Sequence, residues 1–128
     1  MITQKTKMVT YNGPTFKSLT SWETSYGYDQ VIGKFVNGEK KLGLENEEFK
    51  TLKSGIAQGK LVGGNLGLIS NMCCEKYSID FKNKILFIEE LSKESYPELV
   101  SNYLYKMKQN GVFDEINGIW IGNYENEI

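Results

Sequence analysis

Residues 84–90, Lys-Ile-Leu-Phe-Ile-Glu-Glu, place two carboxylates directly after four consecutive apolar side chains. An apolar run of this length indicates a strand covered on both faces, as in a parallel sheet. The strand would deliver Glu89 and Glu90 to its carboxyl end, where functional side chains of α/β proteins collect. A carboxylate there can orient a catalytic base, but the usual base is histidine, and the chain has none. The stretch therefore indicates one part of an active site whose other parts lie outside the chain.

The residues after this strand complete a strand–helix–strand unit. Ser95 and Glu98 match a capping box, Ser-x-x-Glu, at the start of a helix. Apolar side chains in residues 99–107 fall on one helical stripe, and Gly111 stands where a left-handed C-cap belongs. Residues 118–122, Gly-Ile-Trp-Ile-Gly, predict a second buried strand. Two strands joined by one helix form a parallel, right-handed βαβ unit, so the predicted fold class is α/β.

The earlier part of the chain carries weaker signals. A strand is predicted at residues 56–62, followed by Gly63-Gly64-Asn65, which favours a tight turn. A short helix or turn is expected from Leu66 onward, and a short strand at residues 79–81. Apolar side chains within residues 28–36 share one helical stripe and predict an amphipathic helix.

Length and composition limit the fold and the partners. The 128 residues suit one domain, and we expect residues 1–128 to form it. The net charge of −1, with acids and bases interspersed, gives no electrostatic reason to expect nucleic acid or a membrane as partner. Cys73 and Cys74 predict reduced thiols, because adjacent cysteines rarely form a relaxed disulfide and two cannot make a zinc site. Since the first residues hold no apolar signal core, we expect a cytoplasmic protein. We also expect neither a metal nor a cofactor.

Carboxylates are the main candidates for chemistry. Successive strand side chains alternate in direction, so only one of Glu89 and Glu90 need face a cleft. The alternative is that both cap the next loop or lie in solvent. Glu125 follows the strand predicted at residues 118–122, and parallel strands end on the same side of a sheet. We therefore expect Glu125 near Glu89, where clustered carboxylates would bind a cation, an amine or a hydroxyl-rich ligand; a solvated chain end is the alternative.

Other residues carry weaker hypotheses. Gly63-Gly64-Asn65 lies between a strand and a helix, where backbone amides can hold an anion such as phosphate, although no Walker or dinucleotide motif is present. Trp120 is expected in the core because a buried strand surrounds it, and Trp22 as a core or interface anchor. Some serines are candidate nucleophiles by residue type alone, since no histidine can activate them. These are Ser70, Ser92 and Ser95.

Four ordered motifs are similar to those of a known family. Residues 5–14 resemble a Lys-Thr-Gly-Leu-x-Thr-Phe-x-Gly-Pro segment, and residues 59–66 match Gly-x-Leu-x-Gly-Gly-Asn-Leu. Residues 80–90 match Asp-Phe-x-x-Lys-Ile-Leu-Phe-x-Glu-Asp/Glu, and residues 111–122 match Gly-Val-Phe-Asp followed by Gly-Ile-x-x-Gly. Over nearly its whole length, the chain thereby resembles the C-terminal domain of the LD-carboxypeptidase family of serine peptidases, which includes the microcin C self-immunity peptidases.

The resemblance implies a small, β-rich swivelling domain and a set of site residues. Glu89 would be the glutamate of a Ser-His-Glu triad, where it accepts from the imidazole N–H and stabilises the imidazolium. Gly64 and Asn65 would lie in the substrate-cleft loop. Glu125 would correspond to an acid that contacts ligand in the microcin-type members. The family's adenine-stacking tryptophan has no counterpart, because Trp22 is spaced differently.

The resemblance also implies what the chain lacks. The family's nucleophilic serine lies in a preceding domain and its histidine in a following segment, so we expect the chain to begin after the first and stop before the second. The complete enzyme would hydrolyse an amide bond beside a free carboxylate, in a murein peptide or an aminoacyl-nucleotide antibiotic. We expect the chain alone to be inactive.

The partners expected from this resemblance are the missing nucleophile domain or another copy of the chain, as a homodimer. Both would dock on apolar surface that a truncated domain exposes. The alternative hypothesis gives this apolar surface a binding function of its own. It makes the chain a non-catalytic module that binds a peptide or a protein.

Overall fold

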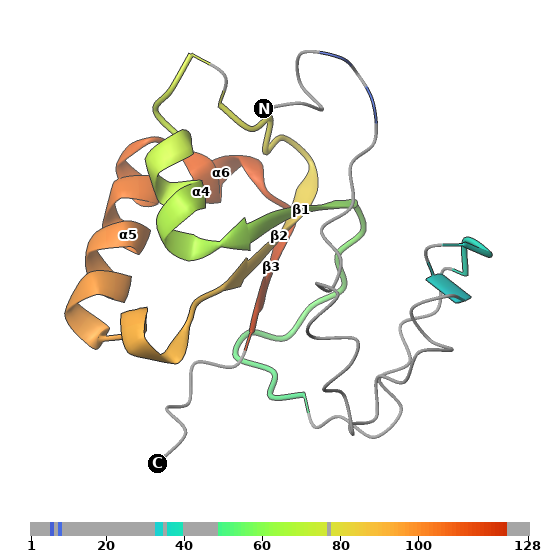
Figure 1. Cartoon of the computed structure of the whole chain (residues 1–128), viewed down its shortest axis with the longest axis horizontal. Coiled ribbons are helices and arrows are strands. Elements are labelled where there is room, and N and C mark those ends of the chain that lie inside the picture. Colours follow the sequence, from blue (N-terminus) through green and yellow to red (C-terminus); the bar gives the residue numbers. More distant parts are fainter. Residues whose placement is uncertain are drawn as a thin grey trace. The chain divides into compact units, whose positions relative to one another are not determined.

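The computed structural model describes residues 6, 8, 33–34, 36–39, 49–76 and 78–122; the side chain of Ser92 lies outside the described atoms. The chain divides into two compact units. The first consists of Met1–Lys7 and Gly55–Ile128, and the second spans Met8–Ser54. In the second unit Gly33 and Lys34 are helical, while most of the helix predicted at residues 28–36 lies outside the described residues. The described strands and the helices α4 to α6 all belong to the first unit (Figure 1).

Three parallel strands form the sheet of the first unit. They are β1 (Lys60–Asn65), β2 (Lys84–Glu89) and β3 (Gly118–Ile121), in the order β1-β2-β3. The apolar run predicted to be a strand is thus the central strand. Its Leu86 and Ile88 are 0% and 1% exposed, which places their side chains in the core.

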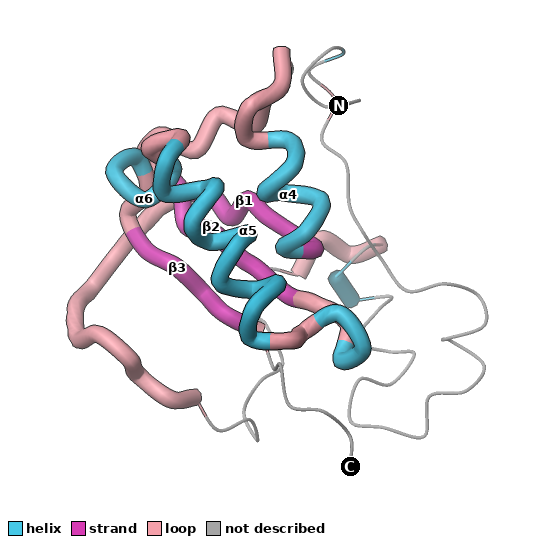
Figure 2. Tube along the Cα trace, turned by 90° about the vertical axis from the view of Figure 1, so that its left-hand side faces the viewer, coloured by secondary structure: helices cyan, strands magenta, loops and turns pink. Residues whose placement is uncertain are grey.

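The helices gather on one face of this sheet. The short helix α4 (Leu66–Met72) follows β1 directly, and the 3-10 turn η1 (Ser92–Glu94) precedes α5 (Pro97–Gln109) and α6 (Val112–Glu115). Figures 1 and 2 show α4, α5 and α6 on the same side of the strands. The apolar faces of the helices and of the sheet close over one core, formed by Leu66, Ile69, Cys73, Phe81, Leu86, Ile88, Met107 and Val112.

The βαβ unit is confirmed. Strand β2 passes through α5 and α6 into β3, and the two strands pair in parallel with Phe87 opposite Trp120. Helix α5 ends at Gln109, and Gly111 follows it with a left-handed φ of 72°, as its position after the apolar stripe predicts. Parallel strands that are connected through helices, with the helices packed on the sheet, are typical of an α/β domain.

The predicted capping box is wrong. Helix α5 begins at Pro97, and Tyr96 is its N-cap residue without a side-chain capping bond. Proline is well suited to the first helical position, because its φ is already helical and its missing N–H needs no partner there. The proline therefore sets the helix start one residue after the position that Ser95 would have capped.

Two predicted strands also need correction. The first strand begins at Lys60 rather than Ile56, whose side chain is fully exposed. Residues 79–81 form no strand: Phe81 packs into the core, and a turn follows in which Asn83 has a φ of 58°. This segment therefore contributes a core side chain and a turn, and it does not pair with a strand.

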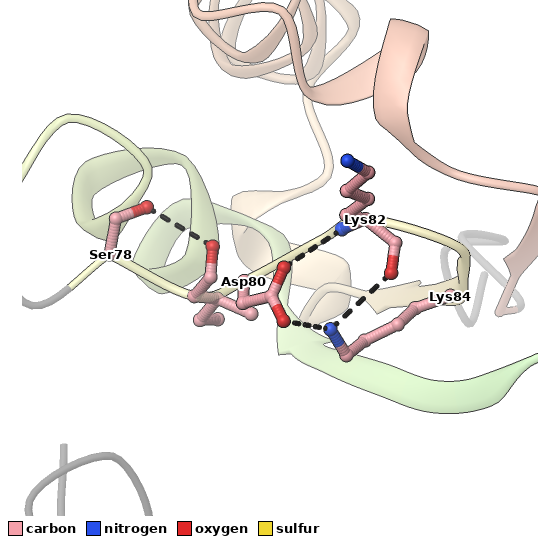
Figure 3. A network of polar contacts seen from close by, with 5 residues as sticks. Ser78, Asp80, Lys82 and Lys84 are labelled. Carbon is pink, nitrogen blue, oxygen red and sulfur yellow. Dashed lines mark hydrogen bonds and ion pairs between the residues drawn. The ribbon is translucent and has the colours of Figure 1, made fainter.

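A polar network closes that turn ahead of β2 (Figure 3). The Asp80 carboxylate accepts from the Lys82 backbone N–H at 3.1 Å and from Lys84 Nζ at 2.6 Å. The hydrogen bond with Lys84, then that with Lys82, lowers the pKa of Asp80. Because Asp80 is exposed, the ion pair contributes little stability.

Glycines in β1 replace the predicted tight turn. Gly63 and Gly64 lie inside the strand, with φ of 147° and 142°. These values are close to glycine-only backbone. At Gly63 a Cβ would lie 1.7 Å from the Phe87 carbonyl oxygen, so β1 approaches β2 too closely for any side chain. The turn assignment failed because it took the glycines as the end of the strand.

Trp120 is half-buried, so the core position expected for it is met only in part. Its ring lies edge-on to Phe87, with centroids 5.8 Å apart and planes at 74°. Trp22 lies outside the described residues. Among the helices that the structure describes, none has the length and apolar character needed to cross a membrane.

Candidate active site

Three strand ends meet at the carboxyl edge of the sheet. In the register of β1 and β2, Asn65 is the partner of Glu89. On the other side of Glu89, the Gly122 N–H donates to the Ile88 carbonyl at 2.8 Å. A Cβ on Gly122 would lie 3.2 Å from the Glu89 Cβ, so the chain leaving β3 passes directly beside this glutamate. Glu89 therefore stands between the ends of both neighbouring strands.

Glu90, the residue after β2, is turned into the protein. Its side chain is 6% exposed, and three donors surround its carboxylate. Oε1 accepts from the Asn65 Nδ2 amide and from the Leu91 backbone N–H at 3.0 Å, and Oε2 accepts from the Gly67 backbone N–H at 3.0 Å. Such charge-assisted bonds offset the cost of burying a carboxylate. Both oxygens of Glu90 are thus occupied within the chain.

Glu89 has the opposite environment. Strand alternation turns it away from the helix-covered face to which Leu86 and Ile88 belong, and its side chain is half-buried. Burial, and then the charge of Glu90, raises the pKa of Glu89. No hydrogen bond joins the Glu89 carboxylate to another described residue. The two adjacent glutamates therefore differ sharply: the described part of the chain occupies one and leaves the other available as an acceptor.

Asn65 connects this edge to helix α4. It is both the last residue of β1 and the N-cap of α4, where its Oδ1 accepts from the Leu68 N–H at 3.1 Å. Its Nδ2 donates to Glu90, which leaves one amide hydrogen for another acceptor. A substrate contact by Asn65 or Gly64 stays a prediction. Both residues lie on the same edge as Glu89.

The remaining predicted site residues are distributed as follows. Glu125 lies outside the described residues, so its proximity to Glu89 stays a prediction. Ser70 is 0% exposed in α4 and therefore inaccessible to a substrate. Ser95 precedes α5 and is half-buried. Within the described ranges, no three potential metal-ligating side chains come together.

The two cysteines are free thiols at the end of α4. Cys73 is buried and Cys74 is exposed, and their Sγ atoms lie 3.7 Å apart. Burial, and then the hydrogen bond with Cys74, raises the pKa of Cys73 to about 11. A thiol with such a pKa stays protonated at neutral pH and is a poor nucleophile.

Sequence reasoning missed the internal role of Glu90. Alternation indicates that two adjacent glutamates diverge, but it does not identify the one that points inward. One signal was available: asparagine is a preferred N-cap residue, and Asn65 directly precedes the apolar Leu66. A helix start at that position places backbone N–H donors near the strand end that carries Glu90.

Comparisons with known proteins identify relatives. Residues 58–127 match the model of the Peptidase_S66C family, described as the LD-carboxypeptidase C-terminal domain. The chain is 32% identical over 133 residues to the "Probable murein peptide carboxypeptidase" of Bacillus subtilis, covering 98% of this chain and 39% of that protein. It is 29% identical over 75 residues to "Putative carboxypeptidase RC0549" of Rickettsia conorii, covering 59% of this chain and 23% of that protein.

A further relative is "Putative carboxypeptidase slr1534" of Synechocystis sp., 23% identical over 120 residues, covering 94% of this chain and 38% of that protein. No solved structure matches the chain significantly. The chain thus spans well under half the length of these curated relatives.

Proposed function

Because this chain belongs to the LD-carboxypeptidase family, whose C-terminal domain it resembles in fold and motifs, we propose that it supplies the glutamate and part of the substrate cleft of a serine carboxypeptidase. The observation that carries the proposal is the state of Glu89. It ends the central strand, its carboxylate has no donor among the described residues, and the ends of β1 and β3 flank it.

The role of Glu89 is to hold a histidine in place. Its carboxylate accepts the imidazole N–H, which fixes the tautomer and leaves the other ring nitrogen free to take a proton from a serine hydroxyl. When the imidazolium forms, the carboxylate stabilises its charge. The chain contains no histidine, so this base comes from outside the 128 residues. The raised pKa of Glu89 makes it a more basic acceptor than an ordinary surface glutamate.

The proposed substrate is a murein peptide, cleaved at an amide bond next to a free carboxylate. The name of the Bacillus subtilis relative supports this class. An aminoacyl-nucleotide conjugate is the alternative substrate, and it enters the test as a second compound. Asn65, with one remaining amide hydrogen, and Gly64 are proposed to contact the substrate at the same edge.

The first test assays the purified chain on a murein tetrapeptide and on an aminoacyl-sulfamoyl adenosine. We expect no turnover of either, because the chain has no histidine to activate a nucleophile. Turnover that Glu89→Gln abolishes would overturn the expected inactivity and would require a mechanism without histidine.

The second test places this chain in the Bacillus subtilis relative, in exchange for the segment that it matches over 133 residues. Hydrolysis of the tetrapeptide by the chimera should fall by about 10³–10⁴-fold with Glu89→Gln, as for other triad acids. The matched control is Glu94→Gln, an exposed glutamate on η1, which should leave hydrolysis unchanged. An inactive chimera beside an active parent would contradict the proposal, and so would a chimera that keeps its activity when it carries Glu89→Gln.

A further inference from the structure

Glu90 is the one strongly buried carboxylate of the described residues, and it makes three hydrogen bonds. The donors come from separate places: the side chain of Asn65 at the end of β1, the backbone of Gly67 in the first turn of α4, and the backbone of Leu91. A buried carboxylate that lost one of these donors would be left partly unpaired, which is costly in a low-dielectric environment. The loss of any one of these three hydrogen bonds is therefore expected to weaken the burial of Glu90 as a whole.

One of these bonds, from Asn65 to Glu90, joins the carboxyl ends of β1 and β2. Asn65 is the register partner of Glu89, and Glu90 follows Glu89 directly. The bond from Asn65 to Glu90 consequently runs diagonally over the pair that contains Glu89. A shift of Glu89 relative to β1 would break this bond, and a shift of α4 would break the bond from Gly67.

The environment of the two glutamates follows from the same contacts. Three donors hold Glu90 inward, so Glu89 must point to the opposite face of the sheet. The charge of Glu90 also lies one residue from Glu89 and contributes, after burial, to its raised pKa. The position and the basicity of Glu89 thus both depend on its neighbour.

We propose that Glu90 is a positioning residue, which braces the end of β2 against Asn65 and the first turn of α4 and thereby fixes the orientation of Glu89. It does not touch the substrate itself. This inference rests on the proposed function for its catalytic meaning, but its two main readouts need no activity.

The test compares the chain with its Glu90→Gln variant by NMR. The first readout is the titration midpoint of the Glu89 side-chain carboxyl carbon, which should fall towards the ordinary glutamate pKa of about 4.3. The second is amide hydrogen exchange at Gly67 and Leu91, which should become about tenfold faster or more, while the amide of the core residue Met107 keeps its rate. Glu94→Gln, on the exposed surface, should change neither readout.

Each result decides the inference. Faster exchange with an unchanged Glu89 midpoint would reduce Glu90 to a structural brace and overturn the positioning role. A shifted midpoint with unchanged exchange would leave only a through-space charge effect and would overturn it as well. If Glu90→Gln fails to fold, Asn65→Ser removes one donor while keeping a good N-cap residue. Unchanged Gly67 and Leu91 exchange in that variant would overturn the brace.

The chimera then links the brace to catalysis. There Glu90→Gln should lower kcat by about 10²-fold through misplacement of Glu89, with KM changed less than about threefold. Loss of activity with Glu89→Gln but none with Glu90→Gln would refute this inference and leave the proposed function standing. No loss with either substitution would refute the proposed function instead.

Discussion

Glu89 and Glu90 are adjacent and have the same side chain, but their carboxylates lie in opposite environments. Glu90 has buried acceptor oxygens and three donors, whereas Glu89 has a half-buried carboxylate with a raised pKa and no donor among the described residues. Enzymes commonly keep such a destabilised group where the reaction requires it, at some cost in folding stability. The cost can be measured at the level of the residue.

Glu89→Gln should therefore stabilise the chain at neutral pH. The folded-state pKa of Glu89 is raised above its unfolded value, so the native state binds the proton more tightly. Its contribution favours folding at acidic pH and is lost as the pH rises through the folded pKa. We expect the Tm of Glu89→Gln to exceed that of the unchanged chain by about 1–3 °C at neutral pH. The difference should vanish in acid, below the unfolded pKa, which circular dichroism melts across this range would reveal; a lower Tm at neutral pH would contradict the assignment.

At the scale of the element, β1 is unusual in having two adjacent glycines inside a strand. Gly63 and Gly64 share a positive φ, but only Gly63 faces an obstacle. The pair therefore separates two physical causes within one strand: backbone strain at both positions, and a collision with β2 at Gly63 alone.

Alanine substitutions at these two positions should differ in cost. Gly64→Ala should lose about 1–2 kcal/mol of unfolding free energy through strain alone, since no atom lies within 4 Å of the position that its Cβ would take. Gly63→Ala should lose more than about 3 kcal/mol, because its Cβ would meet the Phe87 carbonyl oxygen at 1.7 Å and force the strands apart. Urea unfolding of both variants provides the measurement. Equal losses would show that β1 and β2 separate easily.

The sequence predicted those elements whose signals agree at several levels. The apolar run of β2, the stripe of α5 and Gly111 all point to the same βαβ unit, and this unit is what forms. Prediction failed where one local signal competed with another. Helix α5 begins at Pro97 and not after a cap at Ser95. Gly63 lies inside β1 and not in a turn, because β1 packs too closely against β2 for a side chain at this position.

The candidate site was predictable only in part. The strand and its terminal carboxylates follow from the apolar pattern, whereas the choice of Glu89 came from the resemblance. The contacts of Glu90 depend on Gly67 and Asn65, which lie 23 and 25 residues away in sequence. No periodicity in a single sequence reports such a contact. The register of β1 against β2 must be known first.

At the scale of the whole molecule, the hydrophobic core formed by the described residues belongs to one of the two units. Every buried residue of the hydrophobic cluster lies between Leu66 and Val112, inside the part of the first unit that runs from Gly55 to Ile128. Among the described residues, the unit Met8–Ser54 contributes none to this cluster. The described core, the sheet and the Glu90 contacts therefore all lie in the later part of the chain.

A fragment that starts at Gly55 and runs to Ile128 should consequently fold by itself. We expect cooperative urea unfolding, and slow amide exchange at Gly67 and Leu91 as in the whole chain, because the groups that protect these amides lie within the fragment. The whole chain under identical conditions is the control. A fragment with gradual unfolding and rapid exchange at both amides would show that residues within 1–54 are needed for this fold.

The bond between Asn65 and Glu90 has a consequence for how this sequence can evolve. A substitution at either position alone removes this buried hydrogen bond, so we expect the first step of a replacement pair to be deleterious. The second step is then favourable only in the background of the first. The two positions thus form one epistatic unit, and natural drift should exchange them together or keep both.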